Sequence, residues 1–372
     1  MDNIGMPRGW ADRRSILRGV GAIGGTALAV AIPASAALAE DGRTKNFGLP
    51  LVTPDQDFGA ALAANRQVQL VPGAVYTLSS TVELPDGCFI AGNGATVSVS
   101  STAVGALRAS GRRDVTIRDV RFLGQGDSPL NTAPEFDHVA VRVVRSTNVR
   151  ILDCDFENWR GCGTAVSGAG ADDYFAYRVK VLGCAFTRCY FALSAADRSE
   201  YSMAVSNSFT YCRLAVWNSS GNWVVNDNDI VGCHGAYYAT NKTSPYGSAT
   251  SDNWAHGSFT GNTANHSNGG AKELWSAGAA FPVGGVEQDL GRGIVVDGVL
   301  PPTFSGNTLW YTDIRGSNLA GTRWLLSGCV LSNLTVTGSG GAPLVLVGSQ
   351  SNAGGSAPTL VGNAKDALAS LY

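Results

Sequence analysis

Short apolar segments recur along the chain with a shared internal pattern. Each segment ends on an apolar residue and carries another one five positions earlier, with Ala204 as the weak case. The segments occupy residues 115–122, 149–156, 179–186, 203–209, 224–230, 258–264, 303–309 and 325–331. Where no loop-like insertion intervenes, their ends repeat with a period of about 21 to 23 residues, which is typical of the coils of a β-solenoid.

Two positions before each terminal apolar residue, small or amide side chains form a column. Its members are Val120, Cys154, Cys184, Asn207, Asn228, Asn262, Asn307 and Cys329. Alternation along a strand places this column on the inner side, near a sharp turn, where Asn side chains can hydrogen-bond to the coils above and below. A second column contains Cys189, Cys212 and Cys233. The pattern therefore predicts inner ladders of Asn and Cys.

The cysteines also allow two other interpretations. Cys154 and Cys162 flank Asp155 closely enough to suggest a metal site. The chain has no C-x-x-C pair, however, and no His residues repeat at ligand spacing, so buried ladder positions are favoured and no metal is predicted. Disulfides stay open for an exported protein, since the number of cysteines, eight, is even.

From about Val68 to Val347, the repeat with its asparagine ladder resembles the pectate lyase-like superfamily. The resemblance implies an all-β fold, a single-stranded right-handed parallel β-helix. Residues 57–97 are similar to the start of such proteins, with an amphipathic helix that caps the core, followed by the first strands. A cap is needed because an open solenoid end exposes unpaired strand edges. Residues 363–372 are expected to form a short helical cap at the other end.

The first residues resemble a twin-arginine export signal. The Arg13-Arg14 pair precedes an apolar run at residues 20–32, and Ala37-Leu38-Ala39 offers a cleavage site. We therefore expect a signal peptide at residues 1–39, a β-helix domain at residues 40–372, and a periplasmic or secreted protein. No later segment is long and apolar enough to span a membrane, so no membrane contact is expected after signal removal.

The charge content narrows the class of partner. Hydrophobic residues make up 44% of the chain and charged residues only 15%, with a formal net charge of −2. A nucleic-acid-binding protein normally has a basic excess, which is absent here. We therefore expect a near-neutral, turn-rich surface and no nucleic-acid partner.

In the superfamily that this chain resembles, substrate lies along one outer face of the helix. That arrangement implies a groove floor formed by residues 164–168, 191–195, 214–218, 236–240 and 294–298. Four positions after the terminal apolar residues, successive coils supply Arg160, Tyr190, Arg213 and His234. Polysaccharide β-elimination needs a base and a cation that neutralises a uronate carboxylate. We predict His234 or Tyr190 as the base and Arg213 as the cation, against the alternative that these are unrelated turn residues.

Acidic residues on the opposite loop edge support a second chemistry. Asp172, Asp173 and Asp197 lie in loops of adjacent coils. Glycoside hydrolysis uses two carboxylates about 5 to 9.5 Å apart, a distance that adjacent coils would satisfy. The alternative is that these are solvated turn acids, because Asp favours turns.

Aromatic residues on the same coils suit a sugar ligand, because aromatic faces stack on sugar rings. The residues predicted to line the groove are Trp159, Tyr211, Trp217, Tyr237 and Tyr238. Packing beneath the loops is the competing explanation, since aromatic residues are often buried.

Together these features predict an exported, polysaccharide-degrading enzyme, most consistent with a lyase that cleaves a uronate-containing glycan. A glycoside hydrolase and a non-catalytic carbohydrate-binding or structural solenoid are the alternatives. No cofactor is predicted, while a need for a divalent cation and assembly as a homotrimer are left open.

Overall fold

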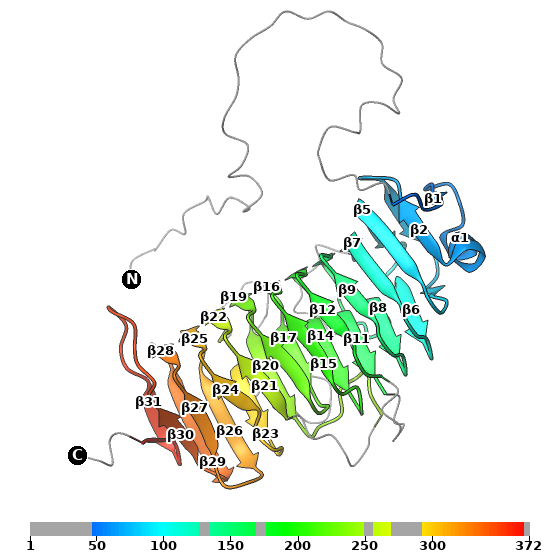
Figure 1. Ribbon diagram of the computed structural model, residues 1–372. Coiled ribbons are helices and arrows are strands. Elements are labelled where there is room, and N and C mark those ends of the chain that lie inside the picture. The colour runs from blue at the N-terminus through cyan, green and yellow to red at the C-terminus, as the bar shows by residue number, and fades with distance from the viewer. Residues whose placement is uncertain (1–46, 126–133, 169–175, 249–255, 269–291, 368–372) are drawn as a thin grey trace, which may run out of the picture. The chain divides into compact units, whose positions relative to one another are not determined.

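The chain winds into a stack of coils whose strands all pair in parallel with those of the neighbouring coils (Figure 1). The computed structural model describes residues 47–125, 134–168, 176–248, 256–268 and 292–367. These residues belong to one compact unit, Arg43–Tyr372. The architecture is a right-handed parallel β-helix, which confirms the predicted fold class. The predicted signal peptide lies outside the described residues.

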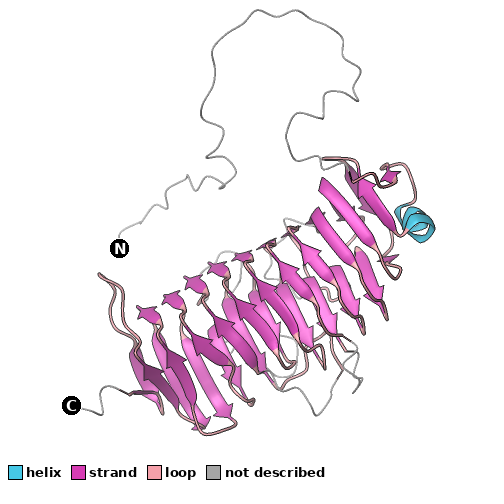
Figure 2. Cartoon of the chain, in the orientation of Figure 1, coloured by secondary structure: helices cyan, strands magenta, loops and turns pink. Residues whose placement is uncertain are grey.

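Most coils contribute three strands, and the third strand of each belongs to an eleven-stranded sheet. Its strands are β4 (Val82–Glu83), β6 (Leu107–Ser110), β8 (Val139–Val144), β11 (Cys162–Ser167), β14 (Phe191–Ala196), β17 (Leu214–Asn218), β20 (Gly235–Thr240), β23 (Gly293–Asp297), β26 (Ile314–Leu319), β29 (Thr335–Gly341) and β31 (Thr359–Gly362). Figure 2 shows these strands side by side along the stack.

The other two strands of each coil form a continuous, sharply bent sheet. Its first limb comprises β1 (Leu51–Val52), β2 (Gln67–Leu70), β9 (Arg150–Leu152), β12 (Lys180–Leu182), β15 (Ser202–Val205), β18 (Trp223–Asn226), β21 (Gly257–Thr260), β24 (Thr303–Ser305), β27 (Trp324–Ser327), β30 (Leu344–Val347) and β32 (Lys365–Asp366). Its second limb comprises β3 (Val75–Leu78), β10 (Asp155–Glu157), β13 (Ala185–Thr187), β16 (Ser208–Thr210), β19 (Asp229–Val231), β22 (Thr263–Asn265), β25 (Thr308–Trp310) and β28 (Val330–Ser332). β5 (Phe89–Val99) and β7 (Thr116–Leu123) run through both limbs.

The bend between the two limbs depends on one residue per coil in the left-handed backbone region. In successive coils these residues are Asp153, Gly183, Ser206, Asp227, Gly261, Gly306 and Gly328, with φ between 53° and 66°. Glycine adopts this conformation without steric cost, and Asp tolerates it better than most residues. The bend leaves the next backbone N–H of each coil in need of an acceptor inside the stack.

The asparagine ladder supplies that acceptor. The Oδ1 atom of Asn228 accepts the backbone N–H of Asn207 at 2.9 Å and its side-chain amide at 3.0 Å. The Nδ2 atom of Asn228 donates to Oδ1 of Asn262 at 2.9 Å and to the carbonyl of Ala204 at 3.1 Å. Asn262 and Asn307 repeat the arrangement in the next coils. The predicted inner ladder of Asn side chains is confirmed.

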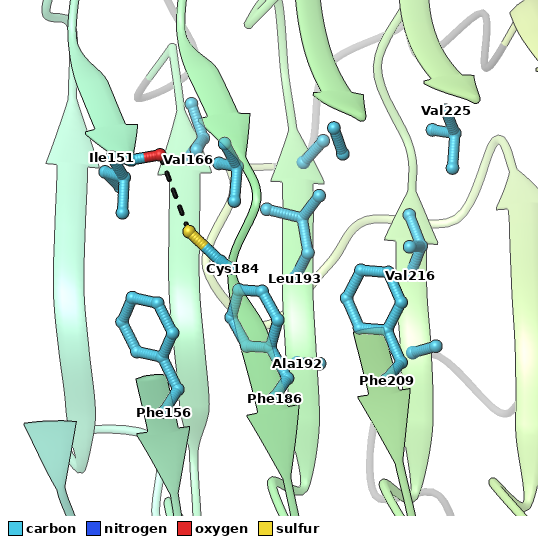
Figure 3. Packing of buried hydrophobic residues seen from close by; sticks show 14 of the residues in the cluster. Ile151, Phe156, Val166, Cys184, Phe186, Ala192, Leu193, Phe209, Val216 and Val225 are labelled. Carbon is cyan, nitrogen blue, oxygen red and sulfur yellow. Dashed lines mark hydrogen bonds between the residues drawn. The ribbon is translucent and has the colours of Figure 1, made fainter. Parts of the chain in front are cut away.

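Cysteine replaces asparagine in the earlier coils of the same ladder. The thiol of Cys184 lies 3.5 Å from the carbonyl of Ile151 in the preceding coil (Figure 3). In the second ladder, the Cys212 backbone N–H lies 3.4 Å from the Cys233 sulfur, and Ser267 takes over the role in the next coil. All eight cysteines are buried free thiols, so the disulfide alternative is wrong.

Stacked aromatic rings fill the interior beside the ladders. The rings of Phe122, Phe156, Phe186 and Phe209 lie in successive coils, with centroids 4.5 to 5.1 Å apart and interplanar angles of at most 16°. Figure 3 shows three of these rings in line along the stack. Because identical side chains occupy the same position in each coil, the spacing of the coils alone brings the rings into contact.

The helix predicted at the N-terminal end is present as α1 (Phe58–Asn65). Asp57 caps it by accepting the backbone N–H of Ala60 at 2.9 Å, and Phe58 and Leu62 bury the side of the helix that faces the first coils. The helical cap expected over residues 363–372 is wrong in its described part. There, residues 365 and 366 form β32, which pairs with β30 and extends the sheet by one more coil.

We expect Asn228→Leu to lower the free energy of unfolding by about 2 to 4 kcal/mol, since it removes the acceptor for Asn207 and the donor to Asn262 inside the core. Exposed Asp229 is the matched control, and Asp229→Asn should change stability by less than about 0.5 kcal/mol. Urea unfolding followed by circular dichroism measures both. Equal midpoints for the two variants would contradict a structural role for the ladder.

Candidate functional site

The strands predicted as a groove floor are β11, β14, β17, β20 and β23 of the eleven-stranded sheet. Every residue of these five strands is buried, whether its side chain faces the interior or the outer face. The outer face carries its own apolar cluster, formed by Val139, Cys162, Ala165, Tyr190, Phe191, Leu214, Trp217, Tyr238, Tyr246 and Val295. The predicted strands are therefore correct, but they do not form an open floor.

Residues 241–248, here called the strap, return from β20 to the outer face of earlier coils. The hydroxyls of Ser244 and Ser194 lie 2.7 Å apart. The Tyr246 ring packs edge-on against Phe191 at 6.3 Å, and the Arg142 guanidinium lies over it at 5.6 Å from its centroid. The strap thus occupies the surface on which an extended substrate was expected to lie.

This packing corrects the predicted aromatic lining of the groove. Trp159 points into the interior, where its indole N–H donates to the carbonyl of Phe122 at 3.1 Å. Tyr237 also points inward, and its hydroxyl accepts the Asn218 amide at 3.1 Å. Trp217 and Tyr238 lie on the outer face, but neither exposes any surface. These four rings serve packing, because the outer face is covered.

Tyr211 is the exception among the predicted aromatic residues. It exposes 37% of its surface, and it lies at a bend rather than on the eleven-stranded sheet. A sugar ring can therefore reach Tyr211 without any rearrangement of the described chain.

The acidic edge predicted for hydrolysis is not an open one. Asp197 is buried, and its carboxylate accepts the Ser167 hydroxyl at 2.7 Å and the backbone N–H of Ser248 at 2.9 Å. The bond from Ser248 anchors the end of the strap. Asp172 and Asp173 lie outside the described residues, so their predicted role stays a prediction.

Three of the predicted catalytic residues form a row directly before β14, β17 and β20. The backbone N–H of Leu214 donates to the carbonyl of Tyr190, and that of Gly235 donates to the carbonyl of Arg213, both at 3.0 Å. These bonds keep Tyr190, Arg213 and His234 in register on consecutive coils. The repeat alone predicted this juxtaposition.

The Tyr190 and Arg213 side chains lie close enough on adjacent coils to interact electrostatically. Burial raises the pKa of the Tyr190 phenol, and the guanidinium of Arg213 partly opposes that change. Burial also lowers the pKa of Arg213, and the nearby cation of Arg292 lowers it further, while Tyr190 opposes the change. Tyr190 and Arg213 each expose 1% of their surface and His234 exposes 5%, so the row lies under a cover of other groups.

Arg160 was predicted to belong to this row but stands one residue before it. Cys162 pairs with Phe191, which places Gly161 beside Tyr190 in the adjacent coil. Arg160 instead forms an ion pair with Glu135, with Nη1 and Oε1 2.8 Å apart. The one-residue difference arises because this turn is one residue longer than the turns that follow.

Two further residues lie at the ends of the row and were not predicted from the repeat. The pairing of β8 with β11 places His138 level with Gly161, and the pairing of β20 with β23 places Arg292 level with His234. Both follow insertions, which hide them from a search by period. Their signal in the sequence is a basic side chain immediately before an apolar strand.

His138 is fully buried against the Trp159 ring, with the ring centroids 4.5 Å apart. The backbone nitrogens of Arg160 and Gln125 lie 3.0 Å from Nδ1 and 3.2 Å from Nε2. A neutral imidazole has one unprotonated nitrogen that can accept a hydrogen bond, whereas an imidazolium has none. Burial lowers the pKa of His138 to about 4, with Glu135 acting to raise it and Arg160 to lower it.

Within the part of the chain that the structure describes, no group of three or more His, Cys, Asp or Glu side chains is arranged to hold a metal ion. A search of the same residues finds no helix with the length and apolar character needed to cross a membrane.

The in-register coils and the polar row before the eleven-stranded sheet define a parallel β-helix protein. The chain belongs to the family described as adenovirus EB1 55K protein / large t-antigen, whose family model matches residues 49–244, more than half of the chain. The E1B 55 kDa protein of human adenovirus B serotype 7 is 24% identical over 174 residues. That match covers 44% of this chain and 31% of the viral protein, so the chain corresponds to less than a third of its relative's length.

Several solved structures are similar in fold, at low sequence identity. The catalytic domain of a GH87 α-1,3-glucanase in complex with nigerose gives a TM-score of 0.39 at 11% identity, over 85% of this chain and 67% of that one. The pre-mature bacteriophage φ29 gene product 12 gives 0.44 at 11% identity, over 80% and 51%. A double mutant of the tailspike protein of E. coli bacteriophage HK620 gives 0.37 at 11% identity, over 82% and 61%.

We expect the stability of the protein to fall as the pH drops from about 6.5 to 4, because the unfolded chain binds a proton at His138 that the folded chain excludes. The stabilisation is complete above the unfolded pKa and disappears as the pH falls through the folded value. Protonation of His138 should lower the free energy of unfolding by an amount on the order of 3 kcal/mol over this pH range. His138→Phe keeps a flat ring against Trp159 and should flatten this part of the pH profile.

Chemical unfolding at a series of pH values measures the effect. The matched control is His266→Phe, at an exposed histidine, which should leave the wild-type profile unchanged. A His138→Phe profile as steep as that of the wild type would assign the acid sensitivity to other groups.

Proposed function

We propose that this chain is an exported β-helix protein that acts on polysaccharides, and that the row of Tyr190, Arg213 and His234 cleaves a uronate-containing glycan by β-elimination. The observation that carries the proposal is the row of buried Tyr190, Arg213 and His234, which backbone hydrogen bonds hold in register on three consecutive coils. Export rests on the Arg13-Arg14 pair and the apolar run that follows it.

The three side-chain types suit the steps of the reaction. A base removes the proton on the carbon next to the uronate carboxylate, the electron pair forms a double bond, and the glycosidic oxygen leaves. The guanidinium of Arg213 would pair with the carboxylate and stabilise the negative charge that develops on it. Tyr190 or His234 would remove the proton.

The cover over this row sets a condition on the reaction. Tyr190 packs against Phe191 with ring centroids 5.0 Å apart, and Phe191 in turn contacts Tyr246 of the strap. We propose that substrate reaches the row by displacing the strap. Closure over a bound glycan would exclude water and strengthen the interaction of Arg213 with the carboxylate.

Hydrolysis receives less support from the same geometry. Of the three predicted acids, Asp197 is engaged through both carboxylate oxygens, by Ser248 of the strap and by Ser167 of β11. Two carboxylates that face a common glycosidic oxygen are required for hydrolysis, and the described residues on this edge do not provide such a pair.

We expect Arg213→Ala to lower the rate of glycan cleavage by at least about a hundredfold, because a cation that stabilises developing charge in a covered site contributes this much or more. The purified chain is incubated with polygalacturonate, alginate, xylan and hydroxyethyl cellulose, and absorbance of unsaturated product is followed together with new reducing ends. Both signals should rise with a uronate polymer. Arg150→Ala, at an exposed arginine outside the row, is the control and should keep full activity.

Reducing ends without absorbance would establish hydrolysis instead. If the wild-type protein gives neither signal with any polymer, the result would favour the non-catalytic carbohydrate-binding or structural solenoid. Equal activity of Arg213→Ala and the wild type would remove the row from the mechanism.

The pH dependence of cleavage distinguishes the two candidate bases. If Tyr190 is the base, the rate should increase with pH to above about 9, because the phenol has its ordinary pKa near 10 and burial raises it further. Tyr190→Phe then abolishes cleavage while His234→Gln only slows it. A rate that levels off near pH 7, with the reverse effects of the two variants, would assign the base to His234.

A further inference from the structure

A second row of residues runs along the stack at the bend between the second and third strands of each coil. Its members are Asn158, Arg188, Tyr211, Gly232, His266, Tyr311 and Asn333, all with φ between 47° and 64°. The backbone N–H of each donates to a carbonyl of the following coil, from Thr187 for Asn158 to Ser356 for Asn333. The hydrogen bonds therefore hold the row in a straight line along the stack.

Four members of this row are neither Asn nor Gly. Asn and Gly are the residues that adopt the left-handed region most readily, and they occupy the row at both ends and at Gly232. Arg188, Tyr211, His266 and Tyr311 adopt it with larger side chains. The two tyrosine rings do not offset this strain by packing in the core, since Tyr211 exposes 37% of its surface and Tyr311 exposes 44%. Local strain of this kind often marks a functional position.

The rings follow one another along the stack. The Tyr211 ring lies over Gly232, where a Cβ atom would come within 2.6 Å of Cε1 of the tyrosine. In the next coils the His266 and Tyr311 rings are 4.7 Å apart with an interplanar angle of 32°, and Trp310 lies 6.0 Å from Tyr311. From Tyr211 to Tyr311 the row spans three coil steps, or about 14 Å. We call Tyr211, His266, Trp310 and Tyr311 the aromatic ledge.

The side chains that face outward beside the ledge are mostly polar. They are Ser208, Thr210, Asp229, Thr263, Asn265 and Thr308, with apolar Val231 between Thr210 and Asn265. The side chain of Asn265 is hydrogen-bonded to His266, with Oδ1 and Nδ1 2.6 Å apart. Hydroxyl and amide groups next to exposed rings match a ligand that presents both apolar faces and hydroxyl groups, as a pyranose ring does.

We infer that the aromatic ledge binds a polysaccharide chain, whose sugar rings stack on Tyr211, His266 and Tyr311 along the direction of the coils. The ligand class rests on the proposed function, but the site is a different one. Only Cys212 separates Tyr211 from Arg213, so a glycan on the ledge runs beside the row of Tyr190, Arg213 and His234. The ledge would hold the polymer next to that row while the strap opens and closes.

Gly232 has a specific part in this site. Its lack of a side chain lets the Tyr211 ring lie against it. Gly232→Ala keeps every ring of the ledge but forces the Tyr211 ring away, so this variant tests the arrangement of the rings rather than their presence.

The test is native affinity electrophoresis of the purified chain in gels that contain polygalacturonate, alginate, xylan or hydroxyethyl cellulose. We expect at least one polymer to retard the wild-type protein, and the combined variant Tyr211→Ala, His266→Ala and Tyr311→Ala to raise the dissociation constant by at least about tenfold. Gly232→Ala should weaken binding in the same direction. The matched control is Tyr201→Ala, at a tyrosine that is 60% exposed with φ 50° at another bend, which should bind like the wild type.

Three results would overturn the inference: no retardation of the wild-type protein by any of the four polymers, equal effects of the combined variant and Tyr201→Ala, or self-association in sedimentation velocity that the combined variant abolishes. The last result would show that the ledge binds a second copy of the chain. Arg213→Ala separates this inference from the proposed function, because Arg213 belongs to the row and not to the ledge. Retardation without cleavage by the wild-type protein leaves the ledge in place and removes β-elimination, whereas cleavage without retardation does the reverse.

Discussion

The register between neighbouring coils is the constraint on which the rest of the structure depends. Each coil bends through left-handed residues, and at the bend into the second limb a buried N–H loses its ordinary partner. The Asn ladder restores that partner, because Oδ1 of Asn228 accepts from Asn207 in the preceding coil while its amide donates to Asn262 in the following one. A coil shifted by one residue would break these bonds and turn its apolar residues outward. The ladder and the Phe stack therefore require the same register.

Much of the fold was predictable because it is periodic. The ladder positions, the third strands of the coils and the N-terminal helix all follow from spacing and alternation, which act locally and repeat. The C-terminal end was not predictable in this way. Residues 365 and 366 carry a helix-compatible sequence, yet they form a strand, because the preceding coil offers an unpaired edge to pair with. Tertiary pairing there outweighs local preference.

The site was predictable only where it follows the period. Tyr190, Arg213 and His234 lie together as expected, whereas Arg160 misses the row by one residue. The covering of the outer face could not be foreseen, because the strap is an insertion whose partners, such as Ser194 and Asp197, lie two or more coils away from β20 in the direction of the N-terminus. Of the ledge, the sequence predicted only Tyr211, as part of the groove over the eleven-stranded sheet. The left-handed bends where the ledge residues lie have no mark of their own in an alternating pattern.

The absence of any disulfide among the eight buried cysteines has a consequence for the conditions under which this fold can persist. No covalent crosslink ties one coil to another, and burial raises the pKa of thiols such as Cys88, to about 12, which keeps them protonated and poorly nucleophilic. The stability of the native state therefore depends little on the reduction potential of the surroundings. Folding of the chain therefore requires no formation or exchange of disulfide bonds.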